Sequence, residues 1–222
     1  MLKNCLECNL IMKKQVSIYS AALTGCSFMI DEMTSCLPLL MDENSEELML
    51  REVKDGNILL MKSQQTRYRA SVEFKRRYAS VPADFWTKYL DMNRQQQLMA
   101  MYYVCLKTYR ILFDLHINVA LKKWKSANRK VTKNDAQNEI YEIAANDEFV
   151  DSWSEETKDR VASSFLTFMR RAGFLDETDT LQAPKLQDAD YRIYLELGDS
   201  WFLQACFLEQ YEIQNIINSY DR

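Results

Sequence analysis

Glycine, proline and histidine are scarce in this sequence. Its 222 residues include 4 glycines, 3 prolines and 1 histidine. Because glycine and proline punctuate tight turns, their scarcity favours long helices and predicts an all-α or mainly α protein. The single histidine, His116, lies in an apolar stretch and has no second histidine with which to share a metal ion. We therefore expect it to be packed and hydrogen-bonded.

Paired cysteine motifs and long hydrophobic runs are also missing. The six cysteines are scattered, and only Cys5 and Cys8 have the CxxC spacing of which a zinc site usually needs two copies. We expect reduced, mostly buried thiols and no bound metal. No apolar run reaches the roughly 18 residues that a membrane span requires, and residues 1–16 are too broken in hydrophobicity for a signal peptide. The prediction is a cytoplasmic protein without a membrane partner.

Signatures of catalysis are absent as well. The glycine-rich loops GxxxxGK[ST] and GxGxxG, which cradle phosphates, do not occur. A Ser-His-Asp or Cys-His arrangement would have to use His116. Acidic pairs such as Asp31 and Glu32 resemble ordinary polar faces, and a carboxylate-only metal nuclease is an alternative that no motif marks. We expect no catalytic activity, no cofactor and no small-molecule substrate.

Charge is distributed unevenly along the chain. Residues 1–133 carry 21 Lys and Arg against 13 Asp and Glu, a balance of +8. Residues 134–222 carry 7 against 19, a balance of −12, and the two balances sum to the formal net charge of −4. This asymmetry indicates contact with a polyanion, or two faces that serve different partners.

Apolar spacing predicts a succession of helices. The longest stretch, residues 93–127, has no internal glycine or proline, and we expect it to bend near residues 108–114. Residues 191–197 alternate in polarity and predict a strand, which precedes a last helix over residues 201–220. The other predicted helices cover residues 17–40, 46–54, 64–79, 133–145 and 154–172, with a short one after Asp84. Domains are expected over residues 17–130 and 131–222, after an irregular extension over residues 1–16.

Residues 146–186 contain the best-marked helix. Ser152, as part of a capping box, or Ser154 can begin it, and Gly173 can end it as a left-handed cap. An acidic turn and a short return strand through Leu181 follow. A helix, a cap and a small hairpin predict a winged helix-turn-helix in which the helix reads the major groove and the hairpin is the wing. The alternative is a surface helix whose polar face is merely solvated.

Two further segments are rich in cations. Helix 64–79 is strongly basic and follows a turn at Gly56, which makes a second helix-turn-helix candidate. The residues expected to anchor it are Tyr68, Val72, Phe74 and Tyr78, with Leu50 facing inward from the preceding helix. Alternatively, this helix packs one face inward while its arginines reach back to water. Residues 122–133 hold six cations and no acid around Trp124, more than a helix dipole alone explains, and are suited to clamping a phosphate backbone.

The predicted DNA contacts combine these two segments with the polar stripe of helix 154–172. They are Arg67, Arg69, Lys75, Arg76, Arg77, Lys122, Lys123, Lys125, Arg129, Lys130, Arg160, Thr167, Arg170 and Arg171. Acidic residues surround helix 154–172, which weakens its case as the reader relative to helix 64–79. Phosphate neutralisation would supply most of the affinity, so we expect salt-dependent and weakly sequence-specific binding to duplex DNA.

Four stretches of the chain resemble the BrxA family. They are YSAALTGCSFMIDE, NILLMKSQQTRYRASVEFKRRY, KTYRILFDLHINVALKKW and WSEETKDRVASSFLTFMRRAGFLDE. The resemblance extends over about residues 17–184 and is most specific in NILLMKSQQTR and RRAGFLD. BrxA proteins are encoded in bacterial BREX phage-defence systems, together with a methyltransferase, an ATPase, an alkaline-phosphatase-like protein and a protease-like protein.

The resemblance implies a helical, helix-turn-helix-bearing DNA-binding protein that serves a multi-protein defence system. It carries over no catalytic residues. The family has also been labelled as inner-membrane proteins, but this sequence has no span that fits the label. Two alternatives stay open: an assembly subunit that uses the helix-turn-helix shape to dock other BREX proteins, its acidic C-terminal part meeting a basic partner, and an RNA-binding helical protein.

Overall fold

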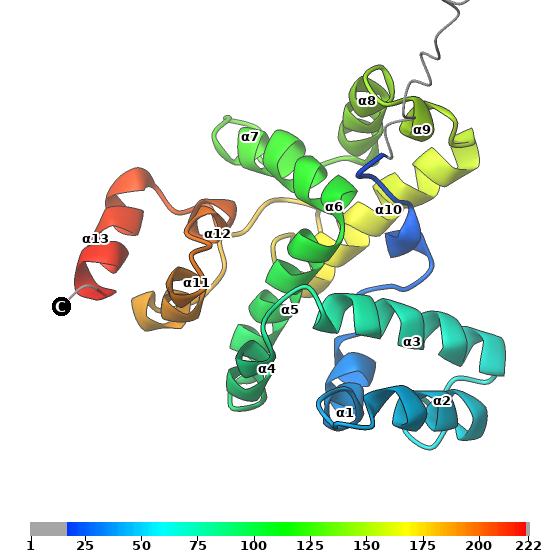
Figure 1. The fold of residues 1–222 in the computed structure, drawn as a ribbon. Coiled ribbons are helices and arrows are strands. Elements are labelled where there is room, and N and C mark those ends of the chain that lie inside the picture. Colours follow the sequence, from blue (N-terminus) through cyan, green and yellow to red (C-terminus); the bar gives the residue numbers. More distant parts are fainter. Residues whose placement is uncertain (1–16, 221–222) are drawn as a thin grey trace, which may run out of the picture.

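Helices make up most of the computed structural model, which describes residues 17–220 (Figure 1). The predicted mainly α class is confirmed. Within that range the only β pairing consists of two isolated antiparallel bridges, Lys130 with Thr180 and Leu175 with Leu181. The elements are η1 (Ala22–Thr24), α1 (Ile30–Leu40), α2 (Ser45–Asp55), α3 (Gln64–Tyr78), α4 (Ala83–Leu90), α5 (Arg94–Thr108), α6 (Arg110–Leu115), η2 (His116–Leu121), α7 (Lys122–Trp124), α8 (Lys133–Ala144), α9 (Glu148–Asp151), α10 (Glu155–Ala172), η3 (Asp188–Tyr191), α11 (Arg192–Glu196), α12 (Trp201–Ala205) and α13 (Gln210–Tyr220).

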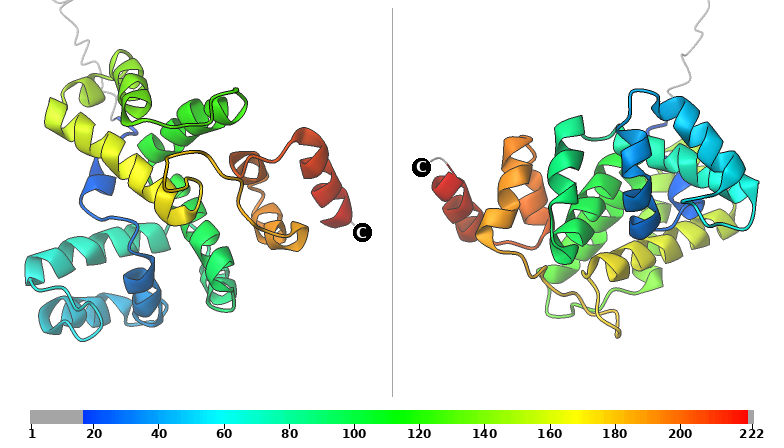
Figure 2. Two further views of the ribbon diagram at one scale, coloured as in Figure 1. Left: turned by 180° about the vertical axis from the view of Figure 1, so that it is seen from behind. Right: turned by 90° about the horizontal axis from the view of Figure 1, so that it is seen from below.

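Helix α5 lies at the centre of the molecule. Every residue from Met99 to Leu106 is buried, as expected of a helix that is apolar almost all round. Asn93 begins the helix with a capping box, in which its side chain accepts from the Gln96 amide and the Gln96 side chain accepts from the Asn93 amide. Helices α1–α3 lie on one side of α5 and α11–α13 on the other (Figures 1 and 2).

The bend predicted in the longest helical stretch is confirmed. Tyr109 has extended dihedral angles, φ −117° and ψ 100°, and separates α5 from α6. Its side chain is buried, and its hydroxyl donates to the Glu73 carboxylate at 2.9 Å while accepting from Arg77 at 3.0 Å. Beyond the bend, α6 continues into the π-helix η2 and the short α7. The chain therefore changes direction where a buried polar group meets α3.

The prediction of one helix over residues 17–40 is wrong for its first half. Residues 22–24 form a single 3-10 turn, and the α-helix begins only at Ile30. The guanidinium of Arg77 takes the carbonyl oxygens of Phe28 and Ser27, each at 2.8 Å, and that of Cys26 at 3.3 Å. A helix would use these carbonyls for its own amides. A tertiary contact thus overrides the local apolar spacing.

Two predictions in the C-terminal part are also wrong. Residues 191–197 form no strand, because η3 and α11 place Tyr191 and Tyr194, three positions apart, on one buried helical face. The expected helix over residues 201–220 is divided into α12 and α13. The division lies at Phe207, which has a positive φ of 67° and a buried ring.

The predicted beginnings and ends of helices agree better with the structure. Thr132 caps α8 with Asp135 in a capping box, and Gly173 ends α10 with φ 85°, as predicted. Ser154 begins α10, so the capping box proposed for Ser152 is wrong. Ser152 instead follows α9 and donates to the Phe149 carbonyl. Among residues 17–220, no helix combines the length and the apolar character needed to cross a membrane. The division into domains at residue 130 stays a prediction, and Cys5 and Cys8 lie outside the described residues.

Candidate nucleic-acid interface

Arg77 does not belong to the predicted surface. Its side chain is fully buried, and its guanidinium is occupied by the three carbonyls of residues 26–28 and by the Tyr109 hydroxyl. It also lies 5.7 Å from the centre of the Phe168 ring, in a cation–π contact with α10. The prediction that Arg77 contacts DNA is therefore wrong, because the residue is part of the core that joins α3 to α10 and the N-terminal segment.

Most other cations of α3 are also occupied within the protein. Arg67 donates to the carbonyl oxygens of Val53 and Lys54, at the end of α2, and of Met61 in the loop that follows. Lys75 forms an ion pair with Glu46 of α2, and Arg76 lies 3.2 Å from the nearly buried carboxylate of Glu73. Arg69 is exposed and has no ion-pair partner among residues 17–220. The basic helix 64–79 thus offers fewer free charges than its sequence indicates.

The basic segment over residues 122–130, which begins with α7, is different. Lys123 is a tether: its ammonium donates to the Lys130 carbonyl at 2.9 Å and pairs with Asp135 at 2.8 Å. The segment's remaining lysines before α8, Lys122, Lys125 and Lys130, are exposed and lack a carboxylate partner in the described part of the chain. Their charges are therefore available to a ligand.

A stack of flat side chains connects this segment to the core. The Arg129 guanidinium lies 3.9 Å from the centre of the Trp124 ring, Trp124 stacks on Phe207 at 4.7 Å, and Phe207 stacks on His116 at 5.6 Å. His116 is buried between the Tyr102 hydroxyl at 2.9 Å and the Ala205 carbonyl at 2.8 Å. Burial lowers the pKa of His116 to about 4, so the ring is neutral near pH 7. His116 is packed as predicted, and the stack fixes Arg129 over the loop.

Helix α10 buries one face and leaves a polar stripe on the other. Val161, Phe165 and Phe168 are fully buried, whereas Arg160 and Arg171 are exposed. Between these two arginines the stripe carries small hydroxyl residues, and Thr167 donates back to the Ser163 carbonyl at 2.9 Å. Arg160 lies 3.8 Å from Glu156, an exposed and weak pair. The stripe has the composition predicted for a groove-reading face, with charges at its ends and small polar groups between them.

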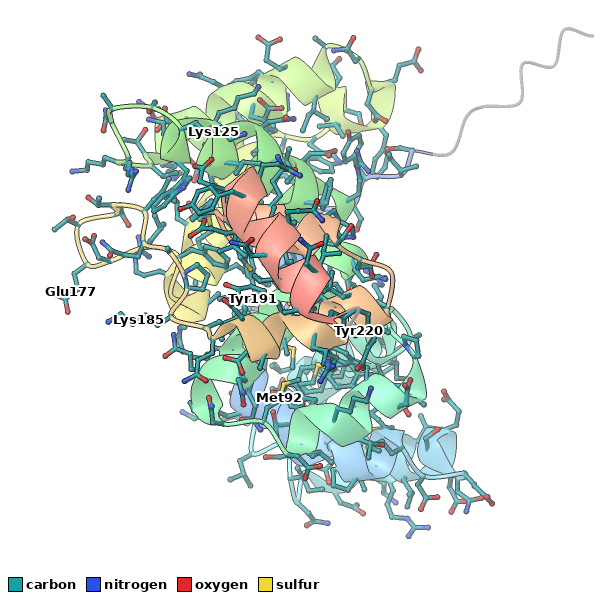
Figure 3. All side chains as sticks on the ribbon, turned by 90° about the vertical axis from the view of Figure 1, so that its left-hand side faces the viewer. Met92, Lys125, Glu177, Lys185, Tyr191 and Tyr220 are labelled. Atoms are coloured by element: carbon teal, nitrogen blue, oxygen red, sulfur yellow. The ribbon has the colours of Figure 1, made fainter. Side chains whose placement is uncertain are left out.

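The segment after α10 returns on itself and meets the basic segment. Asp176 donates its amide to Thr180 and Gln182 donates its amide to Phe174, at 3.0 and 2.9 Å. Residues 129–131 pair with the far side of the same turn, through bonds from the Val131 amide to Asp179 at 2.9 Å and from the Leu181 amide to Arg129 at 3.0 Å. Figure 3 shows the loop with Lys125 and the turn with Glu177 projecting on the same side of the molecule.

Two of the three acidic groups in that turn, Asp176 and Asp179, have structural partners. Asp179 forms an ion pair with Arg170 of α10 at 2.5 Å. The carboxylate of Asp176 accepts from the amides of Thr178 and Thr180 at 2.8 and 2.9 Å, and hydrogen bonds from Thr178 and Thr180 hold its pKa below the usual value. The Arg170–Asp179 pair could not be foreseen, because no sequence signal connects a carboxylate in a turn to one particular arginine. It removes Arg170 from the set of free cations.

The predicted contacts thus fall into two surfaces on different parts of a mainly helical protein. One comprises Arg69 and Arg76 on α3. The other comprises the basic residues 122–130, which backbone hydrogen bonds join to the turn after α10, and the polar stripe lies on the helix that precedes this turn. Burial also raises the pKa of the Cys105 thiol to about 11 and that of Cys36 to about 12, so these cysteines are protonated core residues.

Comparison with known proteins assigns the family. The BrxA family model matches residues 17–196, and the chain belongs to the BrxA family. Membership suggests a BREX-associated role. A crystal structure of an uncharacterized protein from Magnetospirillum magneticum has the same fold, with a TM-score of 0.70 over 85% of this chain and 97% of that chain at 17% sequence identity. No curated protein matches the sequence.

Proposed function

We propose that this BrxA-family protein is a non-enzymatic, DNA-binding component of a BREX phage-defence system. It binds duplex DNA mainly through phosphate contacts and works together with other BREX proteins. The observation that carries the proposal is the group of exposed lysines Lys122, Lys125 and Lys130, which have no carboxylate partner in residues 17–220 and are held beside the turn that follows α10. Phosphates are the anions that such a patch neutralises.

The order of elements supports a winged-helix assignment for this region. Helix α8 and helix α10 follow the segment 129–131, and the chain after α10 then turns back through the isolated bridge Leu175–Leu181 and meets that segment at the bridge Lys130–Thr180. In winged helix-turn-helix proteins the second helix of the motif enters the major groove. We assign that role to α10, whose stripe from Arg160 to Arg171 carries small polar side chains.

The acidic turn gives this proposed wing an unusual character. Glu177 is exposed at its tip, so the turn repels phosphates. We therefore place the backbone contacts on residues 122–130 and at Arg171, and not on the wing. Counterion release then provides most of the affinity, and little sequence preference is expected.

The test is the salt dependence of binding to a random-sequence DNA duplex, measured by fluorescence anisotropy with the full chain. In the variant Lys122→Gln/Lys125→Gln/Lys130→Gln, the slope of log K against log salt becomes shallower by about 3 units, one for each lost phosphate contact. The matched control Lys54→Gln/Lys62→Gln/Arg69→Gln removes the same charge from exposed positions on and between α2 and α3. It leaves the slope at the wild-type value.

Absence of binding at low salt would refute the proposal, as would an unchanged slope in the triple-lysine variant. A loss confined to the control variant would move the DNA contact to α3. Competition between the duplex and a structured RNA distinguishes DNA binding from the alternative of RNA binding. The proposal requires that duplex DNA displace the RNA.

A further inference from the structure

Exposed apolar side chains gather on α2, α3 and the loop between them. Leu50 is 60% exposed, Leu60 85%, Tyr68 55% and Val72 37%. The sequence led us to expect Leu50, Tyr68 and Val72 to face inward, and the structure corrects this, because Met49, Val53 and Phe74 occupy the buried faces instead. We call Leu50, Leu60, Tyr68 and Val72 the α2–α3 apolar patch. Exposed apolar side chains that lie next to one another mark interaction sites more often than single exposed ones do.

Contacts between α2 and α3 place Leu50 and Val72 on one surface. The Glu46–Lys75 ion pair joins the start of α2 to the end of α3, and Arg67 near the start of α3 binds the carbonyls at the end of α2. The two helices are thus antiparallel, and they lie side by side at the edge of the molecule (Figures 1 and 2). Leu50 follows Glu46 by one helical turn and Val72 precedes Lys75 by one turn, so both lie along the seam between the helices.

Leu60 is held outward by the fold of its loop. The carboxylate of Glu52, itself 5% exposed, accepts from the amides of Ile58 and Leu59 at 2.8 and 2.7 Å. Arg67 binds the Met61 carbonyl at 2.8 Å. Leu59 is fully buried and anchors the loop, which leaves Leu60 directed to solvent. Because the residues on both sides of Leu60 are fixed, this part of the patch is preorganised. Binding of a partner would therefore cost little ordering entropy in this loop.

Positive charge borders the patch. Arg69 and Lys62 are exposed and have no ion-pair partner among the described residues, and Arg76 has only the 3.2 Å contact with Glu73. Two acids of α2 are paired, Glu46 with Lys75 and Glu47 with Arg51, whereas Asp55 at its end is exposed and has no ion-pair partner among the described residues. A surface with an apolar centre and a cationic rim complements a polypeptide with apolar and acidic side chains. Bare phosphates would leave the apolar centre unmatched.

We propose that the α2–α3 apolar patch is a docking site for an acidic, amphipathic segment of a partner protein. This site is separate from the DNA surface at residues 122–130 and α10, and it does not depend on that surface being correct. One molecule could then hold a protein through α2–α3 and DNA through its other cationic surface. The ligand that we propose is a segment in which acidic residues flank apolar ones, as in an amphipathic helix.

The test is site-specific photocross-linking of the full chain in cells that also carry the other genes of the defence system. The photoreactive residue p-benzoylphenylalanine replaces Tyr68, and in a matched control it replaces Phe149, an equally exposed aromatic in α9. The expected result is a cross-link from position 68 to a protein segment that carries net negative charge and apolar residues. Position 149 gives no cross-link to that segment.

Second-site substitutions establish specificity. Arg69→Glu and, separately, Leu50→Ser/Val72→Ser each reduce the yield of the position-68 cross-link about tenfold. Exposed substitutions of this kind should leave folding intact, which thermal unfolding of each purified variant verifies. The affinity of these variants for duplex DNA and its salt dependence stay at wild-type values, so a failure of the DNA proposal is recognised independently.

Three results would overturn the docking proposal. The first is no cross-link from position 68, and the second is a cross-link to nucleic acid. The third is a cross-linked segment that is basic, or whose yield is unchanged by Arg69→Glu. Loss of DNA affinity in Leu50→Ser/Val72→Ser would also count against it, because the patch would then be part of a nucleic-acid surface.

Discussion

The two cation-rich regions of this protein use their charges differently. On α3, Arg77 is buried, Arg67 binds three carbonyls and Lys75 is paired with Glu46, so much of the charge serves the fold. In α7 and the loop that follows it, Lys122, Lys125 and Lys130 remain unpaired within residues 17–220. The density of basic residues in the sequence therefore says little about the charge that a ligand meets.

Exposed apolar groups separate the two regions further. The α2–α3 surface interleaves its arginines with Leu50, Tyr68 and Val72, whereas no large exposed hydrophobic residue occurs in residues 122–130 or on α10. Apolar area stabilises protein–protein contacts but contributes little against a phosphate backbone. This difference is the physical basis for assigning a protein partner to the first surface and DNA to the second.

The largest expected effect concerns the neighbouring residues Arg76 and Arg77. Arg77→Ala leaves the carbonyls of residues 26–28 and the Tyr109 hydroxyl without their donor. Breaking a buried charged network of this kind lowers the free energy of unfolding by roughly 3–5 kcal/mol. Denaturation in urea measures the change. At temperatures where the variant is folded, its affinity for DNA per folded molecule stays at the wild-type value.

The control for that prediction is Arg76→Ala, which removes the same side chain from the exposed neighbouring position. Its contact with Glu73 is half exposed on the arginine side, so the free energy of unfolding changes by about 1 kcal/mol or less. Equal losses for the two variants would contradict the distinction between a structural and a surface arginine on α3.

This pair of arginines also shows where sequence reasoning succeeds and fails. Features fixed by near neighbours were predicted: the cap of α8 by Thr132 and the end of α10 at Gly173 follow from residues within a few positions. Periodicity within α3 does not reveal that Arg77 turns inward to carbonyls about 50 positions earlier in the chain. The same dependence on distant partners explains the failed helix over residues 17–29.

The same division between local patterns and tertiary contacts applies to the candidate site. The sequence located the basic run at residues 122–133 and the polar stripe of α10, because both are local patterns. It did not reveal which charges are free, since the pairs Arg170–Asp179 and Lys123–Asp135 and the stack of Trp124 on Phe207 are tertiary contacts. For the same reason the exposed positions of Tyr68 and Val72 were not foreseen.

A second prediction concerns His116, which supports the loop through Phe207 and Trp124. Its pKa is about 4 in the folded protein and near 6.5 in the unfolded chain, so the unfolded state binds more protons between these values. Stability contributed by the neutral ring is therefore complete above pH 6.5 and is lost as the pH falls towards 4. The loss amounts to about 3 kcal/mol in the free energy of unfolding.

His116→Gln provides the comparison, because glutamine can hydrogen-bond to the Tyr102 hydroxyl and the Ala205 carbonyl but does not titrate. Urea denaturation between pH 7 and pH 4 should show a smaller fall in stability for the variant than for the wild type, by about 3 kcal/mol. Parallel pH profiles for the two proteins would show that the histidine is not held neutral beneath the loop.

The smallest expected effect tests whether α10 belongs to the DNA surface. Asp179→Asn removes a negative charge and frees Arg170, and asparagine accommodates the φ of 63° at this position. Affinity for duplex DNA then rises about threefold at low salt, and the gain disappears at high salt because both charges are partly exposed. Asp55→Asn, the same charge change at the end of α2, leaves the affinity unchanged. An affinity that does not rise in Asp179→Asn would mean that Arg170 contacts no phosphate, which would leave Arg171 as the cation at this end of the stripe.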